Sequence, residues 1–240
     1  MTGHPSPAVP TVTDPRPLTS LLAPLADETT TGLHQGDRFV CWRDHLVEAD
    51  RVGRALRTRL DPQQPPHVGV LLPNSLEFSA LFAAAALGAF VLVGLNPARR
   101  GRALGADIAR SDCALIVTDA AGRELLADTG SSVPVLRVDG PEWPELLAAH
   151  PAVAGPVPVQ AADPDALTML IFTSGTTGDP KAVRCSQRKF AAAGAMLADR
   201  FAVGRDDVAY LAMPMFHSNA LIAGWSVAAA GGASIVVRER

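Results

Sequence analysis

Apolar residues in the first part of the chain follow two alternating patterns. They recur at helical spacing from Trp42 to Leu60, which predicts a helix. Ser75 is placed to cap an Ala-rich helix that runs to about Ala89, and residues 102–110 predict a third helix. Between these helices lie short, continuous apolar runs that are typical of buried strands. The predicted strands span residues 68–72, 90–95, 114–118 and 133–138.

The second part of the chain continues the alternation. Strands are predicted at residues 167–172, 182–185, 208–213 and 234–237, and helices at 187–201 and 220–230. Continuous apolar strands indicate a sheet that is covered on both faces. Strands separated by helices indicate parallel crossovers. The sequence therefore predicts an α/β fold with doubly wound, mostly parallel sheets and flanking helices.

Proline-rich stretches mark the expected domain organisation. Five prolines within residues 1–17 indicate a flexible N-terminal tail, and four prolines between His150 and Pro164 indicate a connector. We therefore expect a first α/β subdomain at 18–150, a connector at 151–166 and a second α/β unit at 167–240.

Composition narrows the functional class. Of the 240 residues, 48% are hydrophobic and 19% charged, which indicates a globular chain. The net charge of -3 argues against nucleic-acid binding. The three cysteines, Cys41, Cys113 and Cys185, form no C-x-x-C pair, so we expect no disulfide framework, no metal site and a reducing, cytoplasmic location.

Two uncharged stretches resemble membrane spans in composition alone. They run from Phe78 to Ala98 and from Val208 to Val237, and both are interrupted by glycine and proline. A spanning helix needs about 20 predominantly apolar residues. We therefore expect each stretch to form a buried helix beside a buried strand. The N-terminus shows no basic segment followed by an apolar one, so no secretory signal is expected.

The loop from Phe172 to Val183 carries the candidate chemistry. Two glycines allow the backbone to approach a ligand closely, and four nearby hydroxyls and the backbone N–H groups suit phosphate oxygens. Lys181 adds a positive charge. A flexible Gly/Ser/Thr linker is the alternative, although the apolar strand before the loop and the Pro-Lys after it disfavour a linker. The candidate residues are Thr173, Ser174, Gly175, Thr176, Thr177, Gly178 and Lys181.

Other nucleotide and hydrolase motifs are excluded by single residues. A Walker loop fails because Pro180 and Ala182 stand at required positions, and no G-x-G-x-x-G occurs. Phe172 occupies the position where a hydrolase nucleophile elbow needs glycine. The chain also lacks the H-E-x-x-H motif of zinc peptidases.

The loop from Thr173 to Lys181 is similar to the signature of the acyl-adenylate-forming, or AMP-binding, superfamily. Three further segments resemble motifs of that family in order and spacing: 42–44, 87–97 and 213–218. Within the superfamily, residues 96–100 and Pro180-Lys181-Ala182 resemble long-chain fatty-acid–CoA ligases of the fatty-acid-transport-protein-like branch. The resemblance covers roughly residues 30–240.

The resemblance implies roles for individual residues. Residues 173–181 would hold the β,γ-phosphates of ATP with its Mg²⁺, and His217 would lie near the attacking carboxylate. Asn219 could line the same acid pocket. On the residues alone, a lone histidine such as His217 is more often a structural residue than a site residue, and its position in the family's motif reverses that preference. The family's glutamate for magnesium and its adenine and ribose contacts would follow Arg240, so we expect an incomplete large domain that is inactive by itself.

The implied activity is ATP-dependent conversion of a carboxylic acid, such as a long-chain fatty acid, to acyl-AMP and then to acyl-CoA. The expected partners are that acid, ATP, coenzyme A and the missing C-terminal portion, with peripheral membrane association left open. Two alternatives remain. The chain could be an inactive fragment or partner-binding relative, or it could belong to an aryl-CoA ligase or an amino-acid adenylation domain.

Overall fold

The computed structural model describes residues 16–173 and 181–238, which form helices and strands in the predicted alternation. The helical segments are α1 (Thr19–Leu22), η1 (Ala23–Leu25), α2 (Trp42–Arg57), α3 (Leu76–Ala86), α4 (Gly101–Arg110), α5 (Ala120–Leu126), α6 (Glu142–Ala148), α7 (Gln187–Arg200), α8 (Ser218–Ala220), η2 (Leu221–Trp225) and α9 (Ser226–Gly231). The strands are β1 (Gly32–Gln35), β2 (Arg38–Cys41), β3 (His67–Leu71), β4 (Val91–Gly94), β5 (Leu115–Thr118), β6 (Val135–Arg137), β7 (Leu167–Thr173), β8 (Lys181–Ser186), β9 (Val208–Leu211) and β10 (Ser234–Val237).

These strands form two sheets. The six-stranded sheet has the order β6-β5-β3-β4-β7-β8 and is parallel except for the β7–β8 pair. The four-stranded sheet has the order β2-β1-β10-β9, and only its β1–β2 pair is antiparallel. The predicted mostly parallel α/β fold is therefore confirmed.

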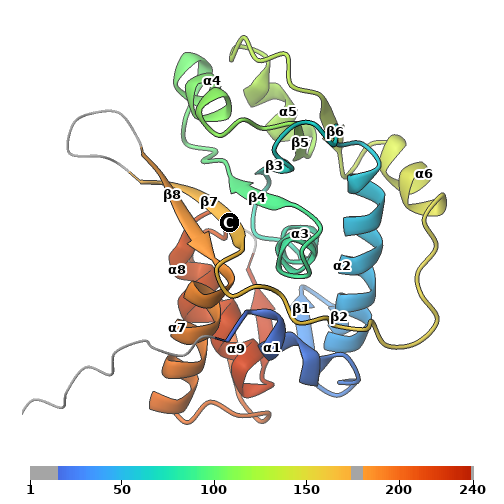
Figure 1. The fold of residues 1–240 in the computed structure, drawn as a ribbon, viewed down its shortest axis with the longest axis vertical. Helices are drawn as coiled ribbons and strands as arrows, with labels where there is room; N and C mark the ends of the chain where they lie inside the picture. The colour runs from blue at the N-terminus through green and yellow to red at the C-terminus, as the bar shows by residue number, and fades with distance from the viewer. Residues whose placement is uncertain (1–15, 174–180, 239–240) are drawn as a thin grey trace, which may run out of the picture.

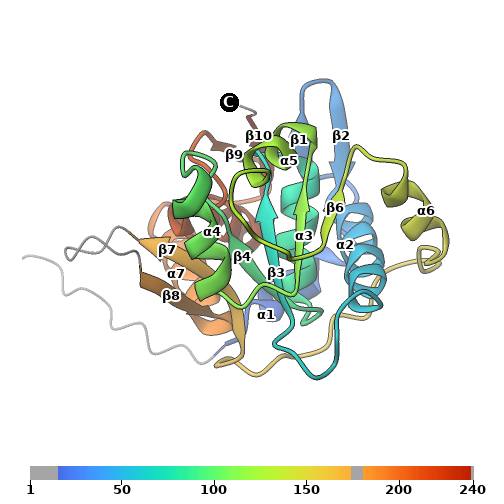
Figure 2. The same cartoon turned by 90° about the horizontal axis from the view of Figure 1, so that it is seen from above.

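Helices cover both faces of the six-stranded sheet (Figures 1 and 2). Successive residues of its strands alternate between two apolar clusters, as the pleat of a strand requires. In β3, for example, Val70 belongs to the cluster with α2 and α3, whereas Leu71 belongs to the cluster with α4 and α5. The first cluster continues through α7 and α9 to Leu33 and Ile235 of the four-stranded sheet. One layer of helices thus fills the space between the sheets.

Helix α3 lies at the centre of that layer. All of its residues except Glu77 are buried. Ser75 caps the helix as predicted, because its hydroxyl accepts a hydrogen bond from the Phe78 amide at 3.1 Å. Phe82 makes edge-to-face contacts with Phe190 of α7 and Trp225 of η2, at centroid distances of 5.0 and 4.9 Å. These contacts connect α3 to the helices of the second half of the chain.

The assignment of strands to sheets differs from the expected division of the chain. Strands β7 and β8 follow the connector, yet they extend the sheet built by the first half. The hairpin β1–β2 was not predicted, and it pairs with β10 through Leu33 and Ile235. The predicted division at 151–166 therefore does not separate the two sheets, because each sheet takes strands from both halves.

The helix predicted at 220–230 is three consecutive pieces with a π-helical turn, η2, in the middle. A side chain at Gly224 would have its Cβ 2.2 Å from Leu211 Cδ2. The glycine therefore allows this wide turn to pack directly on β9. Wide turns of this kind are common beside functional sites.

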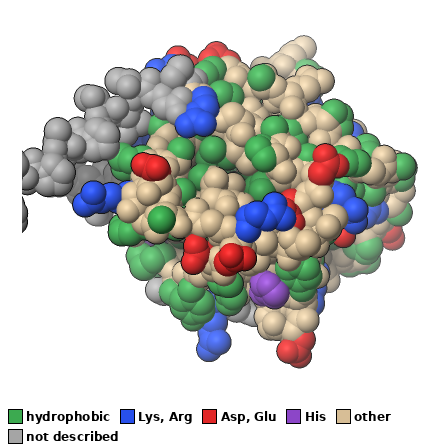
Figure 3. Space-filling view, turned by 90° about the horizontal axis from the view of Figure 1, so that it is seen from below, with side chains coloured by type: hydrophobic (Ala, Val, Ile, Leu, Met, Phe, Trp, Pro, Cys, Tyr) green, Lys and Arg blue, Asp and Glu red, His purple; other side chains and the backbone are tan. Residues whose placement is uncertain are grey.

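Neither uncharged stretch forms a membrane span in the structure. None of the helices within residues 16–173 and 181–238 combines the length and the apolar character that crossing a bilayer requires. On the face shown in Figure 3, acidic and basic side chains are interspersed.

A buried polar chain joins three helices of the central layer. The indole N–H of Trp225 donates to Ser79 Oγ at 2.7 Å, and the Ser79 hydroxyl lies 3.0 Å from His45 Nε2. A hydroxyl donates one hydrogen bond and accepts two, so Ser79 accepts from Trp225 and makes a second hydrogen bond with His45 Nε2, whose role depends on the imidazole tautomer. Burial lowers the pKa of His45 from 6.5 to about 4, although the contact with Ser79 opposes that shift.

The lowered pKa of His45 predicts that the protein loses stability in mild acid. An unfolded histidine takes up a proton near pH 6.5, whereas the folded one resists protonation down to about pH 4. We expect the free energy of unfolding to fall by about 2 kcal/mol between pH 7 and pH 5 from this group. Urea titrations at several pH values would measure the slope. The slope should flatten in His45→Gln, and an unchanged slope would contradict this assignment.

Candidate active site

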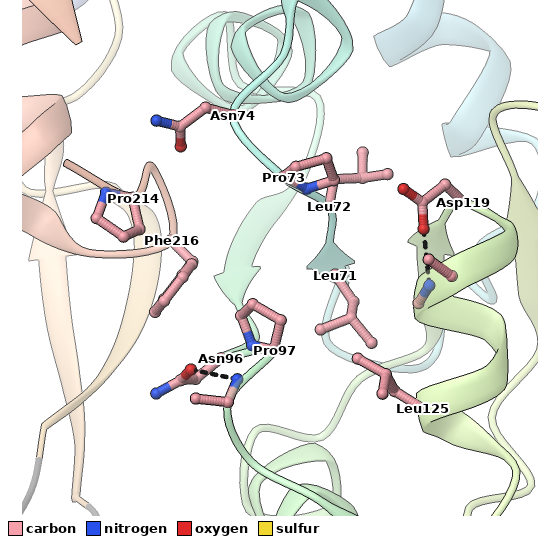
Figure 4. A pocket seen from close by; sticks show the side chains of 13 residues that line it. Leu71, Leu72, Pro73, Asn74, Asn96, Pro97, Asp119, Leu125, Pro214 and Phe216 are labelled. Carbon is pink, nitrogen blue, oxygen red and sulfur yellow. Dashed lines mark hydrogen bonds between the residues drawn. The ribbon is translucent and has the colours of Figure 1, made fainter. Parts of the chain in front are cut away.

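The carboxyl ends of the parallel strands form one edge of the six-stranded sheet, and a pocket opens there (Figure 4). Ligands bind at this edge in open α/β sheets. The pocket holds about 500 Å³ and is mostly apolar. It is lined by Leu71, Leu72, Pro73, Asn74, Asn96, Pro97, Ala98, Asp119, Ala121, Gly122, Leu125, Pro214 and Phe216.

Two polar side chains of the pocket make local hydrogen bonds. Asp119 accepts the Gly122 amide at 2.7 Å and so caps α5. Asn96 Oδ1 accepts the Ala98 amide at 2.8 Å, which forms a tight turn after β4 (Figure 4). Both side chains shape the loops that enclose the pocket.

An ion pair holds the loop after β4 in place. Asp107 of α4 is 1% exposed. Its carboxylate accepts hydrogen bonds from Arg99 Nε at 2.8 Å and from Arg99 Nη2 at 3.2 Å. A bidentate pair of this kind fixes both distance and orientation. It anchors the Asn96–Arg100 segment that suggested the fatty-acid–CoA ligase branch.

The predicted phosphate loop connects β7 to β8 at the same edge. Strand β7 ends at Thr173 and β8 begins at Lys181, and these two residues are paired in the hairpin register. Because β7 runs parallel to β4, the loop leaves the sheet beside the end of β4. Lys181 is exposed. The predicted residues Ser174, Gly175, Thr176, Thr177 and Gly178 lie outside the described residues.

His217 lies at the start of α8, in the segment that follows β9. Its backbone N–H donates to the Pro214 carbonyl at 3.0 Å, and its ring centroid lies 4.3 Å from that of Phe216, with the ring planes tilted by 43°. It is Phe216, and not His217, that lines the pocket. Asn219 is exposed on α8. No hydrogen bond within the described part of the chain joins Lys181 to His217 or Asn219.

Two residues of this region, Asn74 and Gly94, were not singled out from the sequence. Asn74 follows the strand predicted at 68–72, is 5% exposed and bonds to the segment after β9. Gly94 allows the backbone of Phe216 to approach β4. A Pro-Asn pair directly before a helix cap was the one available signal for Asn74, since neither contact is local in sequence.

The described residues contain no group of three or more His, Cys, Asp and Glu side chains that could hold a metal ion. All three cysteines are buried and free of disulfides. Burial raises the pKa of the Cys113 thiol to about 11 and also raises the pKa of Cys41 and Cys185. Since the thiolate is the nucleophile, this arrangement disfavours thiol catalysis.

We predict that the native protein resists alkylation of its cysteines. At pH 8 a thiol with a pKa near 11 is ionised in roughly one molecule per thousand, and burial also blocks the reagent. Iodoacetamide followed by mass spectrometry should show no rapid labelling of the folded chain. The chain unfolded in urea should take up three labels. Rapid native labelling of Cys185 would contradict its position in the core.

Comparison with known proteins identifies the family of this region. The family described as "AMP-binding enzyme" matches residues 26–240. The chain is 49% identical over 235 residues to the Mycobacterium tuberculosis protein named medium/long-chain-fatty-acid–CoA ligase FadD17. The matched residues make up 98% of the chain and 44% of that relative. It is 45% identical over 200 residues to steroid-22-oyl-CoA synthetase of Rhodococcus jostii, covering 82% of the chain and 36% of that relative.

Solved structures share the fold at lower identity. ATP-bound MatB from Rhodopseudomonas palustris has a TM-score of 0.78 at 23% identity, over 91% of the chain and 44% of that structure. Apo MbtA from Mycobacterium smegmatis has a TM-score of 0.77 at 25% identity, over 95% of the chain and 44% of that structure. The chain thus spans less than half the length of these relatives.

Proposed function

The chain belongs to the AMP-binding enzyme family, and on that basis we propose that it contributes the phosphate loop and part of the acid site of an acyl-CoA ligase. The ligase activates a medium- or long-chain fatty acid with ATP. The observation that carries this proposal is the 49% identity, over 98% of the chain, to relatives named as ligases of that class.

The arrangement of the loops supports the proposal. The phosphate loop leaves β7 beside the end of β4, and Phe216 packs against Gly94 at that same end. The segment with His217 therefore follows a strand of one sheet and reaches the edge of the other. A carboxylate held near His217 and a nucleotide held by residues 173–181 would both lie along this edge. Such an arrangement suits a reaction between two bound substrates.

In the first step, an oxygen of the carboxylate attacks the α-phosphorus of ATP. The bond from that phosphorus to the bridging oxygen breaks, and pyrophosphate leaves. Lys181 and the hydroxyls and N–H groups of the loop would stabilise the charge on the departing phosphates by their fixed placement. Mg²⁺ would arrive bound to ATP and neutralise part of the same charge.

In the second step, the thiol of coenzyme A loses its proton to solvent and its sulfur bonds to the acyl carbonyl carbon, while the bond from that carbon to the phosphate oxygen breaks and AMP leaves with its electron pair. The chain's own cysteines are buried, so the acceptor thiol is the external one. The remaining length of the family's proteins would supply the other contacts to ATP and coenzyme A. We therefore propose the complete reaction for a protein that includes these 240 residues and spans the full length of its relatives, called the longer protein below.

A steroid side-chain acid is the second candidate substrate. The 45% identity to the steroid-22-oyl-CoA synthetase favours it, although over a shorter part of the chain. A fatty acid and a steroid acid both present an apolar body behind one carboxylate. They differ in width, so a substrate panel separates them.

Lys181→Ala should weaken ATP binding. A charge-assisted hydrogen bond contributes about 1.5–3 kcal/mol, so we expect roughly a ten- to hundredfold rise in the dissociation constant for MgATP. Calorimetry on the 240-residue chain would measure it. Lys189→Ala is the matched control, because Lys189 is the only other lysine and lies on α7. Equal affinity in wild type and Lys181→Ala would remove this lysine from the site.

We expect acid-dependent pyrophosphate release from the longer protein. The assay would supply MgATP, hydroxylamine as trap, and acids from acetate to palmitate together with a steroid side-chain acid. Release should rise with fatty-acid chain length and disappear in Lys181→Ala. Release only with the steroid acid would favour the second candidate. Inactivity with every acid, despite ATP binding, would contradict the ligase assignment.

A further inference from the structure

We propose that Asn74 is a positioning residue, and that it fixes the segment from Met213 to His217 against the carboxyl edge of the six-stranded sheet with the help of Gly94. The geometric part of this proposal stands on the contacts of these residues alone. Its consequence for catalysis rests on the proposed function.

Both polar atoms of the Asn74 side chain make hydrogen bonds to the backbone at the end of β9 and in the segment that follows it. Its Oδ1 accepts the Met215 amide at 2.7 Å, and its Nδ2 donates to the Met213 carbonyl at 2.9 Å and to the Leu211 carbonyl at 3.4 Å. An amide side chain both accepts and donates, whereas a carboxylate only accepts. Asparagine therefore matches the alternating N–H and C=O groups of this backbone. Figure 4 shows the Asn74 side chain near Pro214 of the same segment.

Asn74 is mounted on a rigid element. It lies between β3 and the capped first turn of α3, and the Leu76 amide next to it donates to Gln35 Oε1 at 2.9 Å. The side chain is 5% exposed, so water competes little for its hydrogen bonds. A buried amide left without hydrogen-bond partners would destabilise the fold. The three hydrogen bonds therefore fix the position of residues 211–215 relative to Asn74.

Gly94 provides the second point of fixation. A Cβ at this position would lie 2.6 Å from the Phe216 carbonyl oxygen and 2.8 Å from Met169 Cε. A Cβ atom essentially never lies that close to a backbone oxygen, so any other residue would displace Phe216. Because Gly94 has no side chain, the Phe216 peptide packs directly against the backbone of β4.

Together these contacts set the place of His217. The turn that the His217 amide closes with the Pro214 carbonyl is held on one side by Asn74 and on the other by Gly94. Asn74 follows β3 and Gly94 ends β4, the adjacent strand of the same sheet, while the segment follows β9 of the other sheet. A displacement of about 1 Å in a reacting group can cost a hundredfold in rate. His217 therefore depends for its position on residues that do not touch it.

Hydrogen exchange would test the positioning role without any substrate. In Asn74→Leu, which is similar in size and cannot hydrogen-bond, the Met215 amide should exchange at least tenfold faster, while protection in α3 stays within twofold of wild type. Asn74→Asp keeps the acceptor and should protect Met215 better than Asn74→Leu does. Ser75→Ala is the matched control, since it removes the adjacent helix cap but no contact to residues 213–217.

Steady-state kinetics of the longer protein would test the catalytic consequence. Asn74→Leu and Gly94→Ala should each lower kcat at least tenfold with KM for ATP within about twofold, because the phosphate loop is untouched. Unchanged Met215 exchange in Asn74→Leu would overturn the anchor. Faster exchange with unchanged kcat would overturn the catalytic part. If wild type is inactive with every acid, the proposed function fails, and the exchange data still decide the anchor.

Discussion

Burial of α3 on every side is the constraint on which the rest of the structure depends. Ten of its eleven residues are buried, and the one that is not, Glu77, lies in its first turn. A helix without a polar face must be surrounded by protein. The six-stranded sheet covers one side of α3, and the helices of the second half, backed by the four-stranded sheet, cover the other. The two halves of the chain therefore fold into one common core.

This shared core brings the functional segments together. Because the central helices fill the space between the sheets, the carboxyl ends of β3 and β4 meet the segment that follows β9. The chain Trp225–Ser79–His45 and the aromatic contacts of Phe82 hold that helical layer in a single arrangement. The lining of the pocket and His217 then lie on loops that are mounted on a rigid frame. Loops on rigid frames are where binding and catalysis concentrate.

The fold and the function rest on different observations. Structures at 21–25% identity share the fold across more than nine-tenths of the chain, and that similarity alone fixes only the architecture. The ligase assignment comes from the 49% identity to FadD17 and from the motif between β7 and β8. The chain spans about 44% of that relative's length, so it holds one part of the proposed site.

The sequence by itself determined the order of the elements, and it located between β7 and β8 the motif that we propose binds phosphate. Apolar periodicity located α2, α3 and the strands β3, β4, β5, β7 and β10, because a local pattern of burial shows directly in the residues. It missed the β1–β2 hairpin and the short helices α5 and α6. The periodicity also predicted a single helix at 220–230, where the structure has a π-helical turn that includes Gly224.

Only the tertiary structure decided which strands share a sheet and which side chains meet. The pairing of Leu33 with Ile235 and the bonds between Asn74 and Met215 join residues 202 and 141 positions apart. Such contacts depend on how the whole core closes over α3, and no local pattern records them. Pro73 and Asn74 follow a strand and look like an ordinary turn in the sequence. Only the fold brings the segment after β9 within hydrogen-bonding distance of Asn74.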